Sequence, residues 1–306
     1  MTAPRISVLI ATADRPELLE DCLRCLRAST FQDAEVLVLD QSRAPVPPPA
    51  LNDSDGGPRV RHVLCPRRGK SAALNVGISL ARGSLLAFTD DDCRVAPDWL
   101  EVMAVALEQG ERLVLTGRVL AGETEGETAA AAPSLRDDAA ERIYRQPASR
   151  DVLFGNNMAI PAEILRRVGP FDEALGPGTP APAAEDNDLG YRLLKAGIPI
   201  RYLPAMVVVH RSWRGEREQV GLYLGYGLGQ GAFYRKHLAR RDLHMLSRMA
   251  RSLWSAGRDA GGAVLLGRPY DFRASTAFAS GLLKGFLRGA PGVAGRGNGA
   301  MPGEGR

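Results

Sequence analysis

Apolar runs alternate with segments of helical periodicity through the first hundred residues, and this alternation restricts the chain to few architectures. The runs ISVLIAT (6–12) and AEVLVLD (34–40) have the length and composition of buried strands. Between them, leucines and cysteines recur at helical spacing after Pro16, a residue favoured at the start of a helix. Strands that alternate with helices are typical of a mostly parallel sheet covered by helices. The sequence therefore predicts an α/β fold.

The rest of the chain continues this pattern. Further strands are predicted at 59–64, 85–92, 112–120, 152–161 and 200–210, and helices at 69–83, 97–110, 162–169, 185–197, 217–240 and 243–288. Segments rich in Pro, Gly or Ala predict loops at 43–58 and 121–134, and the tail 289–306 is expected to be disordered.

Composition limits the class of protein. The chain has 306 residues, of which 45% are hydrophobic, enough for one large core. Its apolar runs are far shorter than the ~20 residues that cross a bilayer, and the start of the chain lacks the pattern of a signal peptide, so we expect a cytoplasmic protein. Cys22 and Cys25 form a CxxC, but their helical spacing favours buried thiols over a redox or metal site.

Three consecutive carboxylates, Asp90, Asp91 and Asp92, end an apolar run. Their mutual repulsion is costly unless cationic partners offset it, and a divalent cation such as Mg²⁺ or Mn²⁺ would do so. In an extended chain Asp90 and Asp92 would face one side and Asp91 the other. A solvated acidic turn is the alternative, and the triplet alone does not decide between them.

Other acidic residues follow the predicted strands. Asp14 comes directly after the first strand and Asp40 ends the second. Because ligands of such sheets bind beyond the carboxyl ends of the strands, we expect these side chains and the triplet to converge on one crevice.

Two other phosphate-binding classes fit less well. The GKS at 69–71 lacks the glycine that a P-loop needs at position 64, which is Leu64. A sugar-1-phosphate nucleotidyltransferase would carry a glycine- and arginine-rich loop after the first strand, where this chain reads ATADRPELL.

Five segments, in order, resemble those of family-2 glycosyltransferases with the GT-A fold. They are SVLIATADRPELLEDCLRCL, EVLVLDQS, GKSAALNVGISLARGSLLAFTDDDC, GNNMAIP with VGPFDEALGPG, and EDNDLGYRLLKAG. The likeness covers about residues 5–215. It implies a Rossmann-like GT-A catalytic domain at 1–215, followed by a basic helical region at 216–288.

The resemblance implies a nucleotide-diphosphate sugar as donor. The residues that it places at the nucleotide are Thr12, Asp14, Asp40, Lys70, Asp90 and Asp91. Many relatives carry a second acidic residue where this chain has Gln41, so the identity of the donor's nucleotide base remains open. A solvated lysine at a helix start is the alternative for Lys70.

The triplet resembles the DxD motif of the family, which implies that Asp92 and Asp90 bind Mg²⁺ or Mn²⁺. His210, at a strand end where many relatives have a metal-binding histidine, is a third candidate ligand. A purely structural histidine remains the alternative.

Glu185 and Asp186 resemble the ED motif of the family, in which the aspartate takes the proton of the acceptor hydroxyl. This role implies inversion at the anomeric carbon. An acidic pair stabilised by the helix dipole would explain the position equally well. The resemblance also places Gly155, Asn156 and Asn157 near the donor sugar or the acceptor.

The chain lacks the QxxRW motif and the membrane helices of processive synthases, so transfer of a single sugar to a glycan or lipid-linked saccharide is expected, in cell-surface polysaccharide or glycoconjugate synthesis.

From residue 235 onward there are 13 Lys or Arg and 4 Asp or Glu. This basic region would either meet an anionic membrane surface or pack on the catalytic domain. Aromatic and basic residues do not interleave, so no nucleic-acid partner is expected. A catalytically inert scaffold that binds nucleotide sugars is the alternative function.

Overall fold

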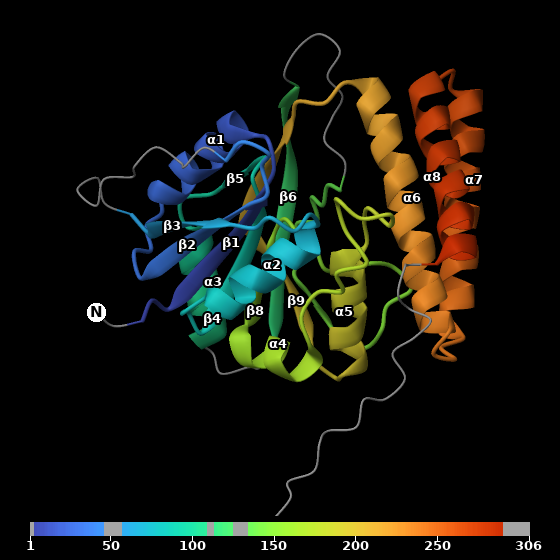
Figure 1. Cartoon of the computed structure of the whole chain (residues 1–306). Coiled ribbons are helices and arrows are strands. Elements are labelled where there is room, and N and C mark those ends of the chain that lie inside the picture. The colour runs from blue at the N-terminus through green and yellow to red at the C-terminus, as the bar shows by residue number, and fades with distance from the viewer. Residues whose placement is uncertain (1–2, 46–56, 109–112, 125–133, 290–306) are drawn as a thin grey trace, which may run out of the picture.

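A central sheet of nine strands organises the molecule in the computed structural model, which describes residues 3–45, 57–108, 113–124 and 134–289 (Figure 1). The strands are β1 (Ile6–Thr12), β2 (Ala34–Asp40), β3 (Arg59–Leu64), β4 (Leu85–Asp90), β5 (Cys93–Val95), β6 (Val114–Thr124), β7 (Arg142–Tyr144), β8 (Met158–Pro161) and β9 (Ile200–Ser212). The helices are α1 (Pro16–Arg27), α2 (Lys70–Leu80), α3 (Trp99–Glu108), α4 (Ala162–Val168), α5 (Glu185–Lys195), α6 (Glu216–Leu238), α7 (His244–Leu265) and α8 (Pro269–Arg288). The expected α/β architecture is confirmed.

The strand order is β3-β2-β1-β4-β8-β6-β9-β5, and β7 pairs with β9. Strands β1 to β4 pair in parallel with one another, with Thr12 opposite Asp40 and Ala11 opposite Asp90. The carboxyl ends of β1, β2 and β4 therefore lie side by side, as the sequence predicted. Strands β5, β7 and β8 add antiparallel pairings, so the complete sheet is mixed.

Three predicted strands differ in detail from the structure. The strand expected at 85–92 ends at Asp90, because residues 91 and 92 form a turn that leads into β5. The side-chain alternation that we expected for Asp90, Asp91 and Asp92 therefore does not apply. The strand expected at 152–161 begins only at Met158, and the strand expected to end at 120 continues to Thr124. Parts of the predicted loops, 46–56 and 125–133, and the tail 290–306 lie outside the described residues.

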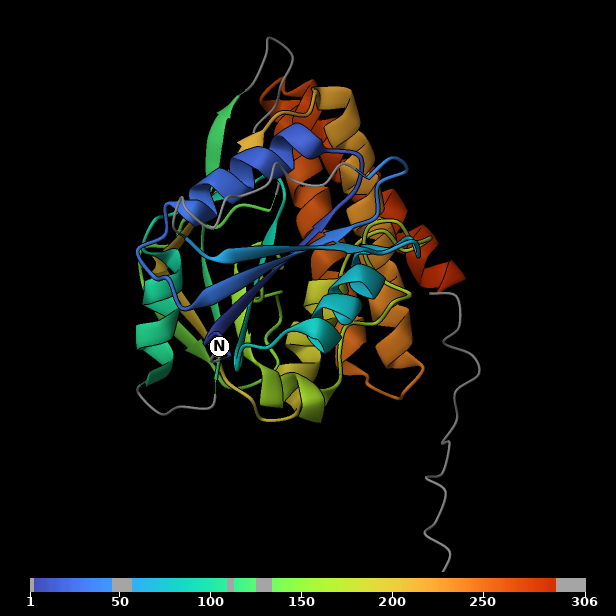
Figure 2. The same ribbon diagram turned by 60° about the vertical axis from the view of Figure 1, so that its left-hand side comes forward.

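Helices cover both faces of the sheet (Figure 2). Apolar side chains form one buried cluster on each face. Helices α1 and α3 bury Leu23 and Trp99 against one face, and α2 and α5 bury Leu74 and Leu189 against the other. Cys22 is buried in the first of these layers, where burial raises the pKa of its thiol well above the usual value. This agrees with a packing role for the cysteine.

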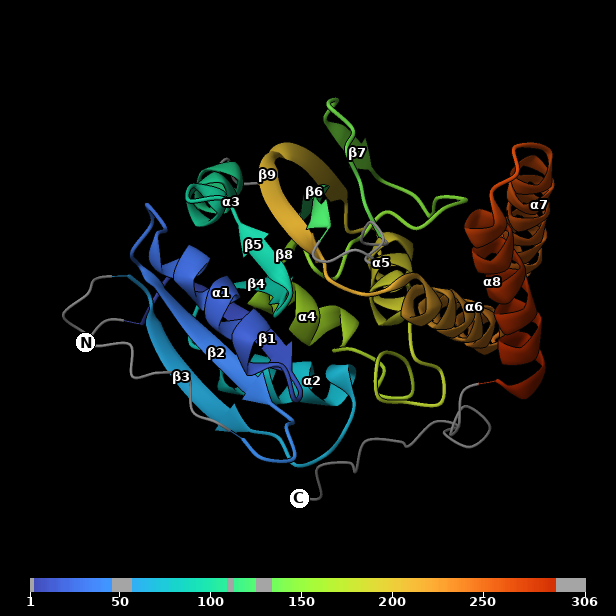
Figure 3. The same cartoon turned by 90° about the horizontal axis from the view of Figure 1, so that it is seen from above.

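Helices α6, α7 and α8 stand side by side, with α6 next to α5 (Figure 3). A third apolar cluster, which includes Tyr191 of α5, Phe233 of α6 and Leu282 of α8, joins them to the α/β part. The fully buried carboxylate of Asp188 accepts hydrogen bonds from Lys236 at 2.6 Å and His237 at 2.8 Å. The basic helices therefore pack on the rest of the molecule. Among the described residues, no helix combines the length and apolar character needed to cross a membrane.

Glycines let α6 and α8 approach closely. A Cβ atom at Gly231 would lie 2.1 Å from the carbonyl oxygen of Leu282, and one at Gly285 would lie 2.1 Å from that of Leu228. Since both neighbours are backbone atoms, a side chain at these positions would force the helices apart.

Gly231→Ala is expected to lower the free energy of unfolding by roughly 1–3 kcal/mol through this overpacking. Gly257→Ala, in α7, is the matched control because nothing lies within 4 Å of the added Cβ. The control is expected to raise stability by up to about 1 kcal/mol, as alanine favours helix over glycine. Urea denaturation of both variants measures the difference, and equal stabilities would contradict the close helix contact.

Candidate active site

A cavity of about 340 Å³ opens at the carboxyl ends of the parallel strands. Lys70 at the start of α2 and Asp90 at the end of β4 line it on one side. Glu185 and Asp186 in the first turn of α5 line it on another, and His210 of β9 contributes as well. Residues far apart in the sequence thus meet here because the strand ends and helix starts share one edge of the sheet.

Lys70 joins the two acidic groups of the cavity. Its Nζ lies 2.5 Å from Oδ1 of Asp90 and 3.6 Å from Oε1 of Glu185, and its side chain is only 15% exposed. Burial alone would lower the pKa of Lys70, but the charges of Asp90 and Glu185 raise it well above the usual value. Lys70 is therefore a cation held inside the site, and the alternative of a solvated lysine is wrong.

Asp91 and Asp92 are both buried. The hydroxyl of Thr12 donates a hydrogen bond of 2.7 Å to Asp91, and Arg15 lies 3.0 Å from Asp91 and 3.4 Å from Asp92. Burial, together with the charge of Asp92, raises the pKa of Asp91 to about 7 against the opposing effect of Arg15. The alternative of a solvated acidic turn is thus wrong for these two residues.

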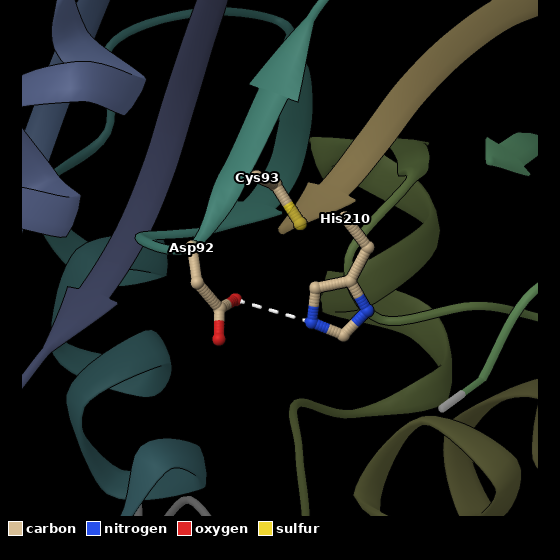
Figure 4. A group of neighbouring side chains, drawn as sticks. All are labelled: Asp92, Cys93 and His210. Carbon is tan, nitrogen blue, oxygen red and sulfur yellow. Dashed lines mark ion pairs between the residues drawn. The ribbon is translucent and has the colours of Figure 1, made fainter. Parts of the chain in front are cut away.

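Asp92, Cys93 and His210 form a compact group (Figure 4). Pairing of β5 with β9 sets Cys93 opposite His210, and Oδ1 of Asp92 lies 3.4 Å from Nε2 of His210. Burial would raise the pKa of Asp92, but the hydrogen bond and charge of His210 lower it well below the usual range.

The carboxylate of Asp92 is an oxygen donor that suits Mn²⁺ or Mg²⁺, and the imidazole of His210 is a nitrogen donor that suits Mn²⁺ better than Mg²⁺. The thiol of Cys93 is a soft ligand, which suits Mg²⁺ or Mn²⁺ poorly. Burial and the neighbouring carboxylates also raise its pKa well above the usual value. Asp92 and His210 therefore fit a hard divalent cation better than the complete group does.

Asp186 faces the same cavity from α5. Its Oδ2 accepts a hydrogen bond of 2.9 Å from the backbone N–H of Gly155, and its Oδ1 accepts one of 2.8 Å from the N–H of Asn187. Burial and the adjacent charge of Glu185 raise the pKa of Asp186 to about 7, although these N–H groups and Lys70 oppose the shift. The carboxyl group can therefore exchange a proton near neutral pH.

The glycosyl transferase family 2 model matches residues 7–173, more than half of the chain. The chain belongs to this family. The prediction of a family-2 glycosyltransferase is thus confirmed. The match ends within the segment that joins α4 to α5.

The chain is also similar in sequence to known glycosyltransferases. The glycosyltransferase is 28% identical over 212 residues to glycosyltransferase AglE of Haloferax volcanii, a match covering 67% of this chain and 68% of AglE. It is 26% identical over 148 residues to EpsH of Bacillus subtilis, where the match covers 48% of this chain and 41% of EpsH. The chain thus spans less than half of EpsH.

The fold agrees as well. The solved structure of the mannosyltransferase PcManGT from Pyrobaculum calidifontis, in complex with GDP-Man and Mn²⁺, aligns over 94% of this chain and 88% of that protein, with a TM-score of 0.62 and 16% identity. The expected GT-A fold is confirmed.

The three residues expected near the donor sugar or the acceptor do not all lie at the cavity. Gly155 and Asn156 line the cavity, and a Cβ at Gly155 would come within 3.2 Å of Oδ2 of Asp186. Asn157 is fully buried, accepts a hydrogen bond from the indole of Trp99 and donates to the carbonyl oxygens of Arg118 and Met206. Its amide joins β6 to β9 and is fully used there, so the structure gives no support to a role at the donor or acceptor.

The residues at the ends of β1 and β2 lie at the adjoining edge. Asp40 is buried and accepts hydrogen bonds from the N–H of Ser42 and from His62. Asp14 is exposed and accepts a hydrogen bond from the N–H of Arg43. The hydroxyl of Thr12 is directed to Asp91, so this threonine positions a carboxylate.

Three residues that the sequence analysis did not single out meet Asp92. Trp213 donates a hydrogen bond of 3.2 Å to its Oδ2, and Arg214 lies 3.4 Å from the same oxygen, as does Arg15. Only proximity in sequence signalled them: Arg15 follows Asp14, and Trp213 and Arg214 come shortly after His210.

Proposed function

We propose that this glycosyltransferase moves a single sugar from a nucleotide-diphosphate sugar to a hydroxyl of a glycan or lipid-linked saccharide, with inversion and with help from Mg²⁺ or Mn²⁺. One observation carries the proposal: a single cavity joins Asp186, whose pKa is about 7, to Asp90, Lys70 and His210. Residues 1–215 would form the catalytic domain.

Asp186 is the base in this proposal. A sugar hydroxyl is a poor nucleophile, so its proton must pass to a carboxylate as the new bond forms. The N–H groups of Gly155 and Asn187 hold the carboxylate of Asp186 in place. Because the hydroxyl attacks the anomeric carbon as the nucleotide leaves from the opposite side, one displacement inverts the configuration.

The opposite wall would hold the donor. The ammonium group of Lys70 would bind the diphosphate as a point charge. The other residues that we assign to the nucleotide site are Thr12, Asp14, Asp40, Asp90 and Asp91. Asp92 and His210, with Asp90 nearby, would hold a divalent cation. When bound, such a cation offsets the negative charge that develops on the leaving diphosphate. The complex of PcManGT with GDP-Man and Mn²⁺ supports this assignment.

The rate of transfer is expected to depend on the ionisation of Asp186. Since its pKa is raised to about 7 and only the carboxylate accepts a proton, kcat should rise with pH through about 7 and level off above it. The charge of Lys70 lowers this pKa, so Lys70→Met should move the midpoint upward. Nucleotide release at saturating donor and acceptor between pH 5 and 9 measures both profiles, and a flat profile in the unmodified enzyme would contradict the assignment.

We also propose that the enzyme binds peripherally to the inner face of the cell membrane. Helices α7 and α8 expose large apolar side chains, among them Trp254, Leu265 and Leu287, which are 66%, 88% and 77% exposed. Exposed arginines on the same helices, such as Arg251 and Arg273, suit an anionic surface.

Co-sedimentation with phosphatidylglycerol vesicles at low salt tests this surface. Trp254→Asp with Leu265→Asp is expected to weaken binding by about tenfold or more, since each side chain would lose its apolar burial. Val105→Asp, on α3, is the control because Val105 is also exposed but lies on another part of the molecule. Binding that is absent in the unmodified protein, or equal in both variants, would contradict the proposal.

A further inference from the structure

A second and larger cavity, of about 830 Å³, lies among the C-terminal helices. Tyr223 and Tyr226 of α6, Ser255 of α7, and Tyr270 and Ser275 of α8 contribute to its lining. Pockets that bury a drug-sized ligand measure about 300–1,000 Å³. This cavity is therefore large enough for more than one sugar ring.

The two cavities are neighbours that share walls. Ser134, Tyr226, Ser252 and Phe278 line both of them. Burial raises the pKa of Tyr226 to about 12, and the carboxylates of Asp90 and Asp92 add to this shift, which places its phenol within electrostatic range of the active site. The larger cavity therefore adjoins the cavity that Asp186 lines.

The lining combines aromatic rings with hydroxyl and charged groups. The rings of Tyr223 and Tyr226 lie edge to face, with centroids 6.0 Å apart, and the hydroxyl of Tyr270 donates a hydrogen bond of 2.7 Å to Gln219. Asp259 and Asp271 add carboxylates. Sugars present apolar C–H faces to aromatic rings and hydroxyl groups to polar side chains, so this mixture suits them.

The lining also has apolar members, among them Ala256, Ala263 and Phe278, but its serines and carboxylates disfavour an occupant made of hydrocarbon alone. Hydrocarbon placed against the serines and carboxylates would remove these groups from water without giving them new hydrogen bonds, which is costly. The exposed apolar side chains of α7 and α8 lie outside this lining, apart from Leu266.

We propose that this larger cavity binds the part of a glycan acceptor that lies beyond the sugar being modified, so that the enzyme prefers an oligosaccharide over a monosaccharide. The inference rests on the proposed function, because it assigns the acceptor of the same reaction.

Methyl glycosides of one to four sugars, from glucose, galactose and mannose series, are the probes. With the unmodified enzyme, KM for the acceptor is expected to fall by at least about tenfold as the probe lengthens from one sugar to three, because the added rings gain contacts in the cavity. Hydrolysis of the donor without acceptor is measured in parallel.

Ser275→Trp and Ser255→Trp narrow the cavity from two different helices. Each is expected to abolish the gain with acceptor length while the rate of donor hydrolysis stays unchanged. Thr276→Trp is the matched control, since Thr276 is the exposed neighbour of Ser275 and does not line the cavity. An unchanged thermal unfolding curve, measured by circular dichroism, shows that a variant is folded. Two positions are tested so that the experiment still decides if one variant does not fold.

The outcomes separate the two proposals. Three results, each obtained with an enzyme that hydrolyses the donor, would overturn the proposed acceptor cavity alone. They are no effect of acceptor length on KM, no transfer to any probe, and the same effect of length in folded variants of both serines. An unmodified enzyme that neither hydrolyses nor transfers any donor sugar would count against the proposed function itself.

Discussion

Asp186→Asn is expected to lower kcat for sugar transfer by roughly 10²–10⁴-fold, the usual contribution of a positioned general base. The amide is close in shape to the carboxylate and can still accept the hydrogen bond from Gly155, so donor binding should change little. It cannot accept the proton of the acceptor hydroxyl. The pH dependence with a midpoint near 7 should disappear with the carboxylate.

The rate of transfer is measured from the amount of product formed. Nuclear magnetic resonance of the product gives its anomeric configuration. We expect inversion with the unmodified enzyme. Donor affinity, measured by calorimetry, serves as the internal control for correct folding of Asp186→Asn. A variant that transfers sugar within tenfold of the unmodified rate would show that Asp186 is not the base.

Asp92→Ala is expected to abolish metal-dependent donor hydrolysis, with a loss of at least roughly a hundredfold. Stabilisation of a leaving diphosphate by a bound cation amounts to several kcal/mol, and each 1.36 kcal/mol changes the rate by about tenfold. The substitution also removes a buried carboxylate that pairs with His210, Arg15 and Arg214, so the free energy of unfolding should fall as well.

Cys93→Ala is the matched control for Asp92→Ala. Cys93 is the third member of the same group, but its soft thiol is not expected to bind a hard cation. Binding of Mn²⁺, followed by electron paramagnetic resonance, should be lost in Asp92→Ala and kept in Cys93→Ala. The opposite pattern, or equal binding in both, would contradict the assignment of Asp92 and His210.

Local patterns were sufficient to predict much of the α/β part. The apolar runs of β1 and β2 matched the observed strands, and the first turn of α5 began at Glu185 as its acidic residues indicated. Parallel strands put their carboxyl ends at one edge whatever their sequence, so the meeting of Asp40 and Asp90 at that edge followed from topology alone.

Long-range pairing could not be predicted in the same way. The strand β5 has three residues and depends on its partner β9, so no local periodicity indicated it, and the turn at Asp91 was read as part of β4. The inward position of Asn157 depends on Trp99, 58 residues earlier in the chain. The cavity among α6, α7 and α8 depends on how three helices pack, and spacing along any one of them does not reveal it.

Release of nucleotide from a panel of UDP-, GDP- and dTDP-sugars, with Mn²⁺, Mg²⁺ or EDTA, tests the central claim most directly. Slow hydrolysis of the donor needs no knowledge of the acceptor. The proposed function predicts metal-dependent release from one donor, lost on addition of EDTA. Absence of release from every donor, together with absence of nucleotide binding in the presence of metal, would contradict it and favour an inert scaffold.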